Sequence, residues 1–225
     1  MRFGIGLRRQ HNNTTLDVWY PQILTDSTIA TAIADVLSIT LDQNQWVSLN
    51  QDQYASLQAQ YFQSLPASIN NKRNTYAMLD AGIFICVDDS VEIHSTEDAY
   101  FRLHVLSHRL AKPHEQSLAG IFGQLPNIAW TTIGPVLPSD LDEVRSSCLV
   151  NGESLTVTHV DKFPYMANYH VPSGVRIADA SRVRLGAYLG EGTTIMPAGF
   201  VNFNAGTLGN AMIEGRVSAG VVIGE

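Results

Sequence analysis

The sequence predicts an α/β N-terminal domain followed by the start of a parallel β-helix. The main observation is a six-residue period between Val171 and Ala219, where seven of nine residues at that spacing are branched aliphatics. The nine residues are Val171, Ile177, Val183, Leu189, Ile195, Val201, Thr207, Ile213 and Ala219. A helix repeats near 3.6 residues and a strand near 2, so neither explains this period. A solenoid in which each flat face turns one aliphatic side chain inward explains it.

Two other positions keep the same phase. Small residues stand two positions before the aliphatic ones, where stacked corners leave little room: Ser181, Ala187, Thr193, Gly199, Ala205 and Ala211. Glycine or asparagine, which tolerate left-handed backbone angles, stands three positions after: Gly174, Gly186, Gly192, Asn204 and Asn210. Short buried strands of an α/β domain are the alternative, but chance alternation would not hold its phase over nine hexads.

Six residues on each of three faces give roughly eighteen residues per coil. The aliphatic residues then form three interior columns: Val171, Leu189 and Thr207; Ile177, Ile195 and Ile213; Val183, Val201 and Ala219. Solenoids of this hexapeptide class wind left-handed, against the usual rule for parallel crossovers. The class, rather than the residues, therefore predicts a left-handed parallel β-helix.

Local patterns predict the elements before the solenoid. The segment Met1–Tyr20 alternates as two strands around a polar turn at residues 11–13. A helix is expected over 26–37, with Asp26 or Ser27 as its N-cap, and a second helix over 51–62. The remaining expected elements are a buried strand over 78–87, a helix over 95–111 that begins with a capping box and ends before Pro113, and strands over 147–169.

These elements predict three parts. They are an N-terminal α/β domain over 1–112, a connector with strands over 113–170, and an incomplete left-handed parallel β-helix over 171–225. The last residues, Val221–Ile223, are apolar and leave a coil unfinished. Because an open apolar strand edge needs a cap or a partner, we expect the chain to be a truncated piece of a longer protein.

Composition restricts the possible functions. The chain has 225 residues, 45% of them hydrophobic and 16% charged, so it can build a core and is not a disordered sequence. Its net charge of −7, with no cluster of basic residues, argues against nucleic acid as a partner. We expect no signal peptide and no membrane partner, because the longest apolar run, Ile83–Val87, is too short. Cys86 and Cys148 are expected to be buried free thiols in strands, which suits a cytoplasmic protein.

Glu214 is the leading candidate for catalysis. It follows the inward Ile213 directly, so we expect its carboxylate to be partly desolvated and suited to accept a proton. Arg216, two residues later, could hold an anionic substrate group through a forked contact. The alternative is a surface ion pair between the two, worth less than about 1 kcal/mol.

Other polar residues are weaker candidates. Arg184 and Arg182 flank Val183 and could bind a dicarboxylate together with Arg176, or could be solvated edge residues. His104 and His108 have the i, i+4 spacing of a zinc pair, but no third ligand is evident, so they are expected to be ordinary core or surface histidines. Ser117, Ser146 and Ser147 lack the context of a hydrolase nucleophile.

Residues 175–224 resemble the tetrahydrodipicolinate N-succinyltransferase family, and especially its actinobacterial and proteobacterial subgroup. The resemblance rests on GTTIM from Gly192, GFVNFNAGTLG from Gly199, MIEGR from Met212 and SAGVV from Ser218. It is close over about fifty residues, whereas the preceding residues match the family only in layout.

This resemblance implies transfer of the succinyl group of succinyl-CoA to the amino group of tetrahydrodipicolinate, as L-2-amino-6-oxopimelate, in lysine and diaminopimelate biosynthesis. It implies a homotrimer with active sites between solenoids, and no permanently bound cofactor. Glu214 stands at the family's catalytic acidic position, either as a general base or as a nucleophile that takes the acyl group. Arg216 matches a residue of the family that is implicated in ligand binding. We predict that Arg184 and Asn202 bind the dicarboxylate substrate with it.

Two departures from the family change these expectations. Some members hold a divalent cation with acidic residues at the positions of Ser181 and Ala198, so we predict no metal there. The later coils that would bind CoA are absent, so we expect little or no turnover by residues 1–225 alone.

Three other functions are alternatives to the succinyltransferase, and two of them depend on histidines in the repeat. Another hexapeptide acyltransferase, such as an acetyltransferase, would typically use a histidine base, and a carbonic anhydrase of this fold needs histidines for zinc. Neither finds a histidine between Val171 and Glu225. A non-catalytic oligomerisation or docking module is the third alternative.

Overall fold

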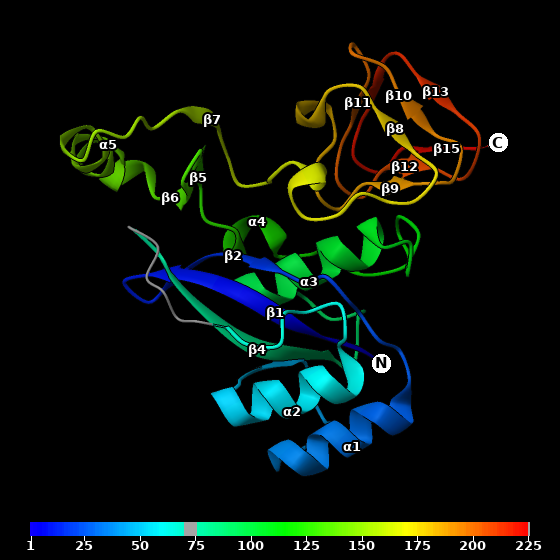
Figure 1. Ribbon diagram of the computed structural model, residues 1–225. Coiled ribbons are helices and arrows are strands. Elements are labelled where there is room, and N and C mark those ends of the chain that lie inside the picture. Colours follow the sequence, from blue (N-terminus) through cyan, green and yellow to red (C-terminus); the bar gives the residue numbers. More distant parts are fainter. Residues whose placement is uncertain (70–75, 225) are drawn as a thin grey trace. The chain divides into compact units, whose positions relative to one another are not determined.

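The chain divides into two compact units in the computed structural model, which describes residues 1–69 and 76–224 (Figure 1). Unit 1 consists of Met1–Val87, His94–Asp98 and Gly120–Lys162. Unit 2 consists of Asp88–Ile93, Ala99–Ala119 and the residues from Phe163 onward. Each unit has its own hydrophobic core.

Unit 1 is built on an antiparallel sheet with the strand order β2-β1-β4-β3. The strands are β1 (Arg2–His11), β2 (Thr14–Trp19), β3 (Gln45–Ser48) and β4 (Met78–Cys86). Asn12 and Asn13 form the β1–β2 turn with φ of 46° and 64°, values that asparagine tolerates best among residues with a Cβ. The predicted hairpin over Met1–Tyr20 and the strand over 78–87 are therefore confirmed.

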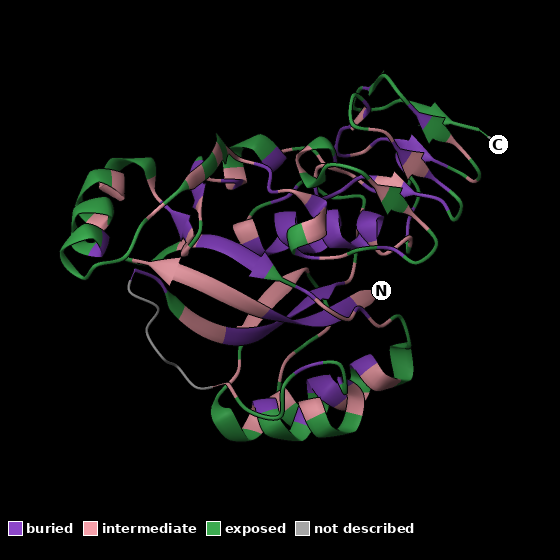
Figure 2. Cartoon of the chain, turned by 45° about the horizontal axis from the view of Figure 1, so that its top comes forward, coloured by how far each residue is buried: buried purple, intermediate pink, exposed green. Residues whose placement is uncertain are grey.

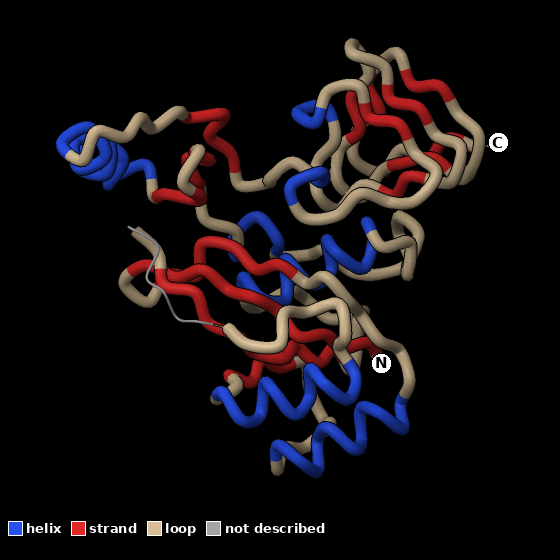
Figure 3. The backbone as a smooth tube through the Cα atoms, viewed as in Figure 1, coloured by secondary structure: helices blue, strands red, loops and turns tan. Residues whose placement is uncertain are grey.

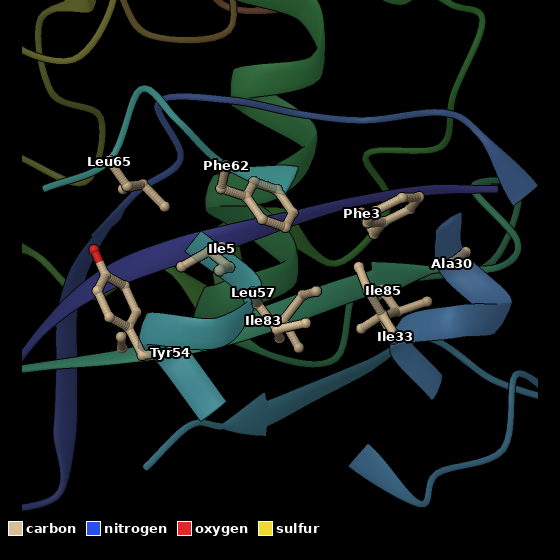
Figure 4. Close-up of a cluster of buried hydrophobic side chains, with 11 residues drawn as sticks. Phe3, Ile5, Ala30, Ile33, Tyr54, Leu57, Phe62, Leu65, Ile83 and Ile85 are labelled. Carbon is tan, nitrogen blue, oxygen red and sulfur yellow. The ribbon is translucent and has the colours of Figure 1, made fainter. Parts of the chain in front are cut away.

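Helices α1 (Ser27–Leu37) and α2 (Gln51–Tyr61) pack on one face of this sheet (Figure 4). Asp26 is the N-cap of α1, as predicted, because its carboxylate accepts from the backbone N–H groups of Thr28 and Ile29. The helices contribute buried side chains that meet those of β1 and β4: Ile33, Tyr54 and Leu57 against Phe3, Ile5, Ile83 and Ile85.

The connector contains more regular structure than its proline and glycine content indicates. It forms α4 (Ile121–Gln124), η1 (Pro138–Asp140), α5 (Leu141–Val150), and a sheet of β5 (Ile128–Thr131), β6 (Gly134–Val136) and β7 (Val157–Asp161) in the order β6-β5-β7. The strand predicted to begin at Ser147 is wrong, because residues 147–150 complete α5. Cys148 is thus in a helix; it and Cys86 are buried free thiols, as predicted.

Helix α3 (Thr96–Ser107) is shorter than the predicted helix over 95–111. Ser95 accepts from the Asp98 N–H at its start, as the capping pattern indicated. The helix ends before Arg109, whose φ of 61° is left-handed and cannot continue a right-handed helix.

The compact units do not follow the predicted bounds at residues 112 and 170. Residues Ala99–Ala119 group with the C-terminal residues in unit 2. The physical reason is a set of hydrogen bonds between side chains of residues 107–109 and backbone groups of the coiled region. The Gly186 N–H donates to Ser107 Oγ at 2.9 Å, and Arg109 donates to the Leu189 and Ser173 carbonyls at 2.5 and 2.8 Å.

The C-terminal part of unit 2, residues 171–224, is a coiled region of two-residue parallel strands (Figure 3). Before it lies the short helix η2 (Met166–Asn168), and within it η3 (Ala180–Arg182). The strands are β8 (Arg176–Ile177), β9 (Tyr188–Leu189), β10 (Thr194–Ile195), β11 (Phe200–Val201), β12 (Gly206–Thr207), β13 (Met212–Ile213), β14 (Arg216–Val217) and β15 (Val222–Ile223). They form three stacks: β13-β10-β8, β11-β14 and β15-β12-β9.

Most of the predicted interior pairing is confirmed. Ile177, Ile195 and Ile213 pair in register, as do Val183 with Val201 and Leu189 with Thr207. The aliphatic residues of these pairs are buried, apart from the half-buried Ile177. Figure 2 shows buried stretches interspersed with exposed ones along the coiled region. Their burial forms the core of unit 2 together with Met166.

The period breaks after Ile213, and two column assignments were wrong. Val217, not Ala219, pairs with Val201, and Ile223 then pairs with Thr207. The corner between β13 and β14 is therefore shorter than the others, because Val217 follows Ile213 after four residues instead of six. At the other end, Val171 is 60% exposed and has no place in the column with Leu189.

The turns largely follow the predicted glycine and asparagine pattern. Gly174, Gly186, Gly192 and Asn204 have φ between 50° and 91°. Asn210 is an exception, since it is not among the residues with positive φ, and Gly220 (φ 84°) takes this role after the shortened corner. The turn position thus moves with the register, because it lies three residues after Val217.

Candidate active site

Pairing of β11 with β14 creates the outer face that carries most of the predicted site residues. Phe200 pairs with Arg216, and Val201 pairs with Val217. Because side chains alternate along a strand and both valines are buried, Phe200 and Arg216 project outward. The bridge between Val183 and Val201 brings the next residue, Arg184, to the same face.

The guanidinium groups of Arg184 and Arg216 both lie against the ring of Phe200. The distances from the guanidinium carbon to the ring centroid are 4.8 Å for Arg216 and 5.9 Å for Arg184. Arg216 Nε donates to Ser218 Oγ at 3.3 Å, and Arg184 Nη1 donates to Asn202 Oδ1 at 3.1 Å. The structure thus brings together three of the four predicted site residues: Arg184, Asn202 and Arg216.

Asn202 is held in one orientation. It is 8% exposed, and its Oδ1 accepts a second hydrogen bond, from the Phe203 N–H at 3.0 Å. Among the described residues no acceptor for its Nδ2 is found. With Oδ1 engaged twice, the amide offers its donor end to a ligand.

Glu214 lies in the shortened corner between β13 and β14, two residues before Arg216. It is exposed, so the partial burial expected from the sequence is not found in this chain. Within residues 1–69 and 76–224, no ion pair joins Glu214 to Arg216. The surface salt bridge that was the alternative is therefore not formed in the described structure.

The other two arginines near Val183 do not join this cluster. Arg182 lies 3.7 Å from the Asp179 carboxylate across η3, and both side chains are half exposed. Arg176 is exposed on β8, in a different stack of strands. A dicarboxylate site that uses all three arginines is therefore not supported.

His104 is a core histidine and His108 is half-buried, which agrees with the expected core or surface roles. His104 is fully buried and donates from Nδ1 to the Tyr100 carbonyl at 2.8 Å. Burial lowers its pKa to about 3, so the ring is neutral near pH 7. The His108 ring stacks on His170 at 3.9 Å, and in the described part of the chain no group of three metal-binding side chains is found.

Sequence reasoning did not identify Phe200 and Phe163 as partners of the arginines. Phe163 is buried, and its ring centroid lies 5.4 Å from the Arg184 guanidinium. The outward position just before each inward aliphatic was a usable signal for Phe200. However, an unbroken six-residue period would have placed Ser218 and not Arg216 beside Phe200 in the following coil, because the shortened corner was not visible in the sequence.

A cavity in unit 1 was also not predicted. It has a volume of about 430 Å³, and its wall includes His11, Tyr76 and Asp140. Hydrogen bonds from the Ser139 hydroxyl and then from the Tyr76 hydroxyl, each 2.6 Å long, lower the pKa of the Asp140 carboxyl. The His11 ring stacks on Tyr76 at 4.0 Å. These contacts satisfy the polar groups locally and do not involve the predicted site.

Among the described helices, none has both the length and the apolar character needed to cross a membrane.

Residues 125–165 match the family model described as "Tetrahydrodipicolinate N-succinyltransferase middle". This segment runs from β5 to β7 and includes α5, so it lies ahead of the residues on which the sequence resemblance rested.

Curated relatives extend the similarity beyond the fifty residues expected. The 2,3,4,5-tetrahydropyridine-2,6-dicarboxylate N-succinyltransferase of Pseudomonas putida is 61% identical over 137 residues, which are 61% of this chain and 40% of that protein. The enzyme of the same name from Salinispora tropica is 60% identical over 133 residues, 59% of this chain and 42% of the relative. The one from Vibrio cholerae is 54% identical over 142 residues, 63% and 41% of the two chains.

The fold has a solved relative. A putative 2,3,4,5-tetrahydropyridine-2-carboxylate N-succinyltransferase from Campylobacter jejuni matches with a TM-score of 0.78 and 26% identity, over 100% of this chain and 64% of that one. The matched residues account for about two fifths of the length of the curated relatives. Over the part that it spans, the chain is thus similar in sequence and in fold to tetrahydrodipicolinate N-succinyltransferases.

Proposed function

We propose that this chain is part of an enzyme that transfers the succinyl group of succinyl-CoA to the amino group of tetrahydrodipicolinate, in its open form L-2-amino-6-oxopimelate. The reaction serves lysine and diaminopimelate biosynthesis. The observation that carries the proposal is the cluster of Arg184, Arg216 and Asn202 beside the corner that holds Glu214. The names of the relatives support the reaction type.

The arginines are suited to the carboxylates of this substrate. A guanidinium group offers parallel N–H donors that match the two oxygens of a carboxylate. Arg184 and Arg216 supply two such groups on one face, and the Asn202 amide adds a neutral donor next to Arg184. The cluster thus favours a dianionic ligand over a neutral sugar or amine.

Glu214 is proposed as the general base. As the substrate nitrogen attacks the thioester carbonyl, the carboxylate takes the proton that the nitrogen loses, and CoA departs as the thiolate. A nucleophilic role, through a mixed anhydride of Glu214, is the alternative, and it requires exclusion of water because the anhydride hydrolyses readily.

Exposure of Glu214 in a single chain supports a site completed by a second copy. An exposed carboxylate has no wall beside it that could hold the acyl donor or exclude water from the reaction. We propose a homotrimer in which a neighbouring solenoid covers the corner, with the coiled region as a left-handed parallel β-helix of the hexapeptide class. The proposed location is the cytoplasm, where the buried free thiols Cys86 and Cys148 would remain reduced. Succinyl-CoA is the co-substrate, and no resident cofactor is proposed.

The test is calorimetric titration of pimelate, a linear dicarboxylate, and of succinyl-CoA into residues 1–225 and three variants. We expect pimelate to bind, Arg216→Ala and Arg184→Ala to weaken binding about tenfold or more, and Arg182→Ala to leave it unchanged. Arg182 is the matched control because it lies in the same region but is paired with Asp179. Equal affinity in all four proteins would contradict the assigned site, and binding of neither ligand would favour the non-catalytic module.

A further inference from the structure

Aromatic rings and guanidinium groups alternate on the outer face of the β11–β14 pair. In order, they are Phe163, Arg184, Phe200 and Arg216, with centroid distances of 5.4, 5.9 and 4.8 Å between successive groups. The Phe163 ring stacks in turn on Phe203, with centroids 4.3 Å apart and planes 8° from parallel. The Phe200 ring is the group that both arginines of the candidate site contact.

Two guanidinium groups on one face repel each other. Because both carry hydrogen-bond donors and no acceptor, they cannot be joined by a hydrogen bond. The face of an aromatic ring carries partial negative charge and attracts a cation within about 6 Å of its centroid. Arg184 is also tied to Asn202, whereas for Arg216 the side-chain hydrogen bond found among the described residues is the 3.3 Å one to the Ser218 hydroxyl. The ring is therefore the stronger restraint on Arg216.

The backbone fixes the ring itself. Val201, the next residue, is fully buried and pairs with Val217, so Phe200 must project outward at the level of Arg216. Gly199, the preceding residue, lets the two coils approach closely here, because a Cβ there would meet the Ile213 carbonyl. The ring position thus follows from the stacking of the coils.

We propose that Phe200 is a positioning residue, which holds the guanidinium groups of Arg184 and Arg216 side by side for the carboxylates of the substrate. This inference rests on the proposed function for the identity of the ligand. The apolar Phe200 side chain would keep the two like charges together before the anion binds. Less side-chain entropy would then be lost when the anion orders them.

The experiment compares Phe200→Leu and Phe200→Tyr in residues 1–225, with Phe122→Leu as the control. Leucine fills similar space without a ring face, and tyrosine keeps the face. Phe122 is 59% exposed and lies in unit 1. One readout is the NMR shift of the Arg184 and Arg216 Nε–H groups, which a ring face moves upfield. The other is the pimelate dissociation constant.

For Phe200→Leu we expect both arginine signals to lose their upfield shift, and pimelate to bind about three- to tenfold more weakly. Phe200→Tyr and Phe122→Leu should match the unchanged protein in both readouts. Should the leucine variant unfold, Phe200→Met provides the same comparison with a more flexible side chain.

Arginine signals that stay in place in Phe200→Leu would overturn the inference whatever the ligand does. Signals that move while pimelate affinity stays constant would also overturn it, since the ring would then order the arginines without consequence for binding. If the unchanged protein shows upfield signals but binds no pimelate, the proposed substrate fails, and the positioning of the arginines by Phe200 stands on the NMR result alone.

Discussion

The sheet of unit 1 and the coiled region of unit 2 achieve burial in opposite ways. In the sheet, β1 pairs along its length with β4, so that Arg2 lies opposite Cys86, far away in sequence. In the coiled region each strand pairs with one from the coil before or after it, as Ile195 does with Ile177 and Ile213. The coil-to-coil contacts can be predicted from the sequence because their residues are regularly spaced. The pairing of β1 with β4 has no regular spacing in the sequence and cannot be predicted in this way.

The two regions also differ in what a residue can tolerate. The core of unit 1 is filled by large side chains, so substitutions that remove side-chain volume should destabilise it most. In the coiled region the backbones themselves approach closely, so substitutions that add side-chain volume should destabilise it most. Gly206 is the clearest case, because a Cβ there would meet the Tyr188 carbonyl of the neighbouring coil.

The largest expected effect is therefore that of Gly206→Val, which should destabilise unit 2 by about 4 kcal/mol or more because backbone must move. Gly215→Ala is the control, since a Cβ there meets nothing within 4 Å. Thermal unfolding with hydrogen exchange of the coiled region measures both. A stable Gly206→Val protein would show that stacked coils can separate without loss of the fold.

In unit 1, Ile33→Ala should cost about 2–5 kcal/mol, because the side chain is fully buried and leaves a cavity. Val36→Ala on the same helix should cost less than about 0.5 kcal/mol, since Val36 is 57% exposed. Denaturant unfolding gives both values. Similar losses from the two substitutions would mean that the burial of Ile33 contributes no more to stability than the contacts of an exposed residue on the same helix.

Lowering the pH should reduce the stability of unit 2 over a pH range that depends on the pKa values of His104 and His170. Burial lowers the folded-state pKa of His104 to about 3, and burial followed by the charge of Arg109 lowers that of His170. The unfolded chain therefore binds protons below about pH 6.5 that the folded chain does not, and stability falls as the pH drops from there toward about 3.

His104→Asn should reduce this slope between about pH 6.5 and 5, by up to about 1.4 kcal/mol per pH unit. His94→Asn should not change it, because His94 is exposed. Unfolding free energies at a series of pH values test the difference. A slope that persists unchanged in His104→Asn would assign the proton uptake to other groups.

The smallest effect is expected at the start of α1, where Asp26→Ala removes the acceptor for two backbone N–H groups. The loss should be about 1 kcal/mol. Asp35→Ala, an exposed carboxylate with no capping role in the same helix, serves as the control. If both substitutions are neutral in denaturant unfolding, the cap contributes nothing beyond what water supplies.

Sequence periodicity predicted the candidate site where its phase held. Arg184 and Asn202 follow Val183 and Val201, which pair as the six-residue period requires, and they are hydrogen-bonded to each other. Arg216 was chosen from its neighbourhood to Glu214, and its contact with Phe200 depends on the four-residue step after Ile213. A composition-based view of residues 113–170 missed α5, because helix propensity is weak there and tertiary contacts decide.

The sequence by itself determined the repeating inward positions, most of the left-handed turns and the caps of the helices, because each depends on residues a few places apart. The tertiary structure alone decided the strand order β2-β1-β4-β3, the grouping of residues 99–119 with the coiled region, and the meeting of two arginines on one ring. Those features depend on which distant surfaces bury each other most favourably, and no local pattern encodes that free energy.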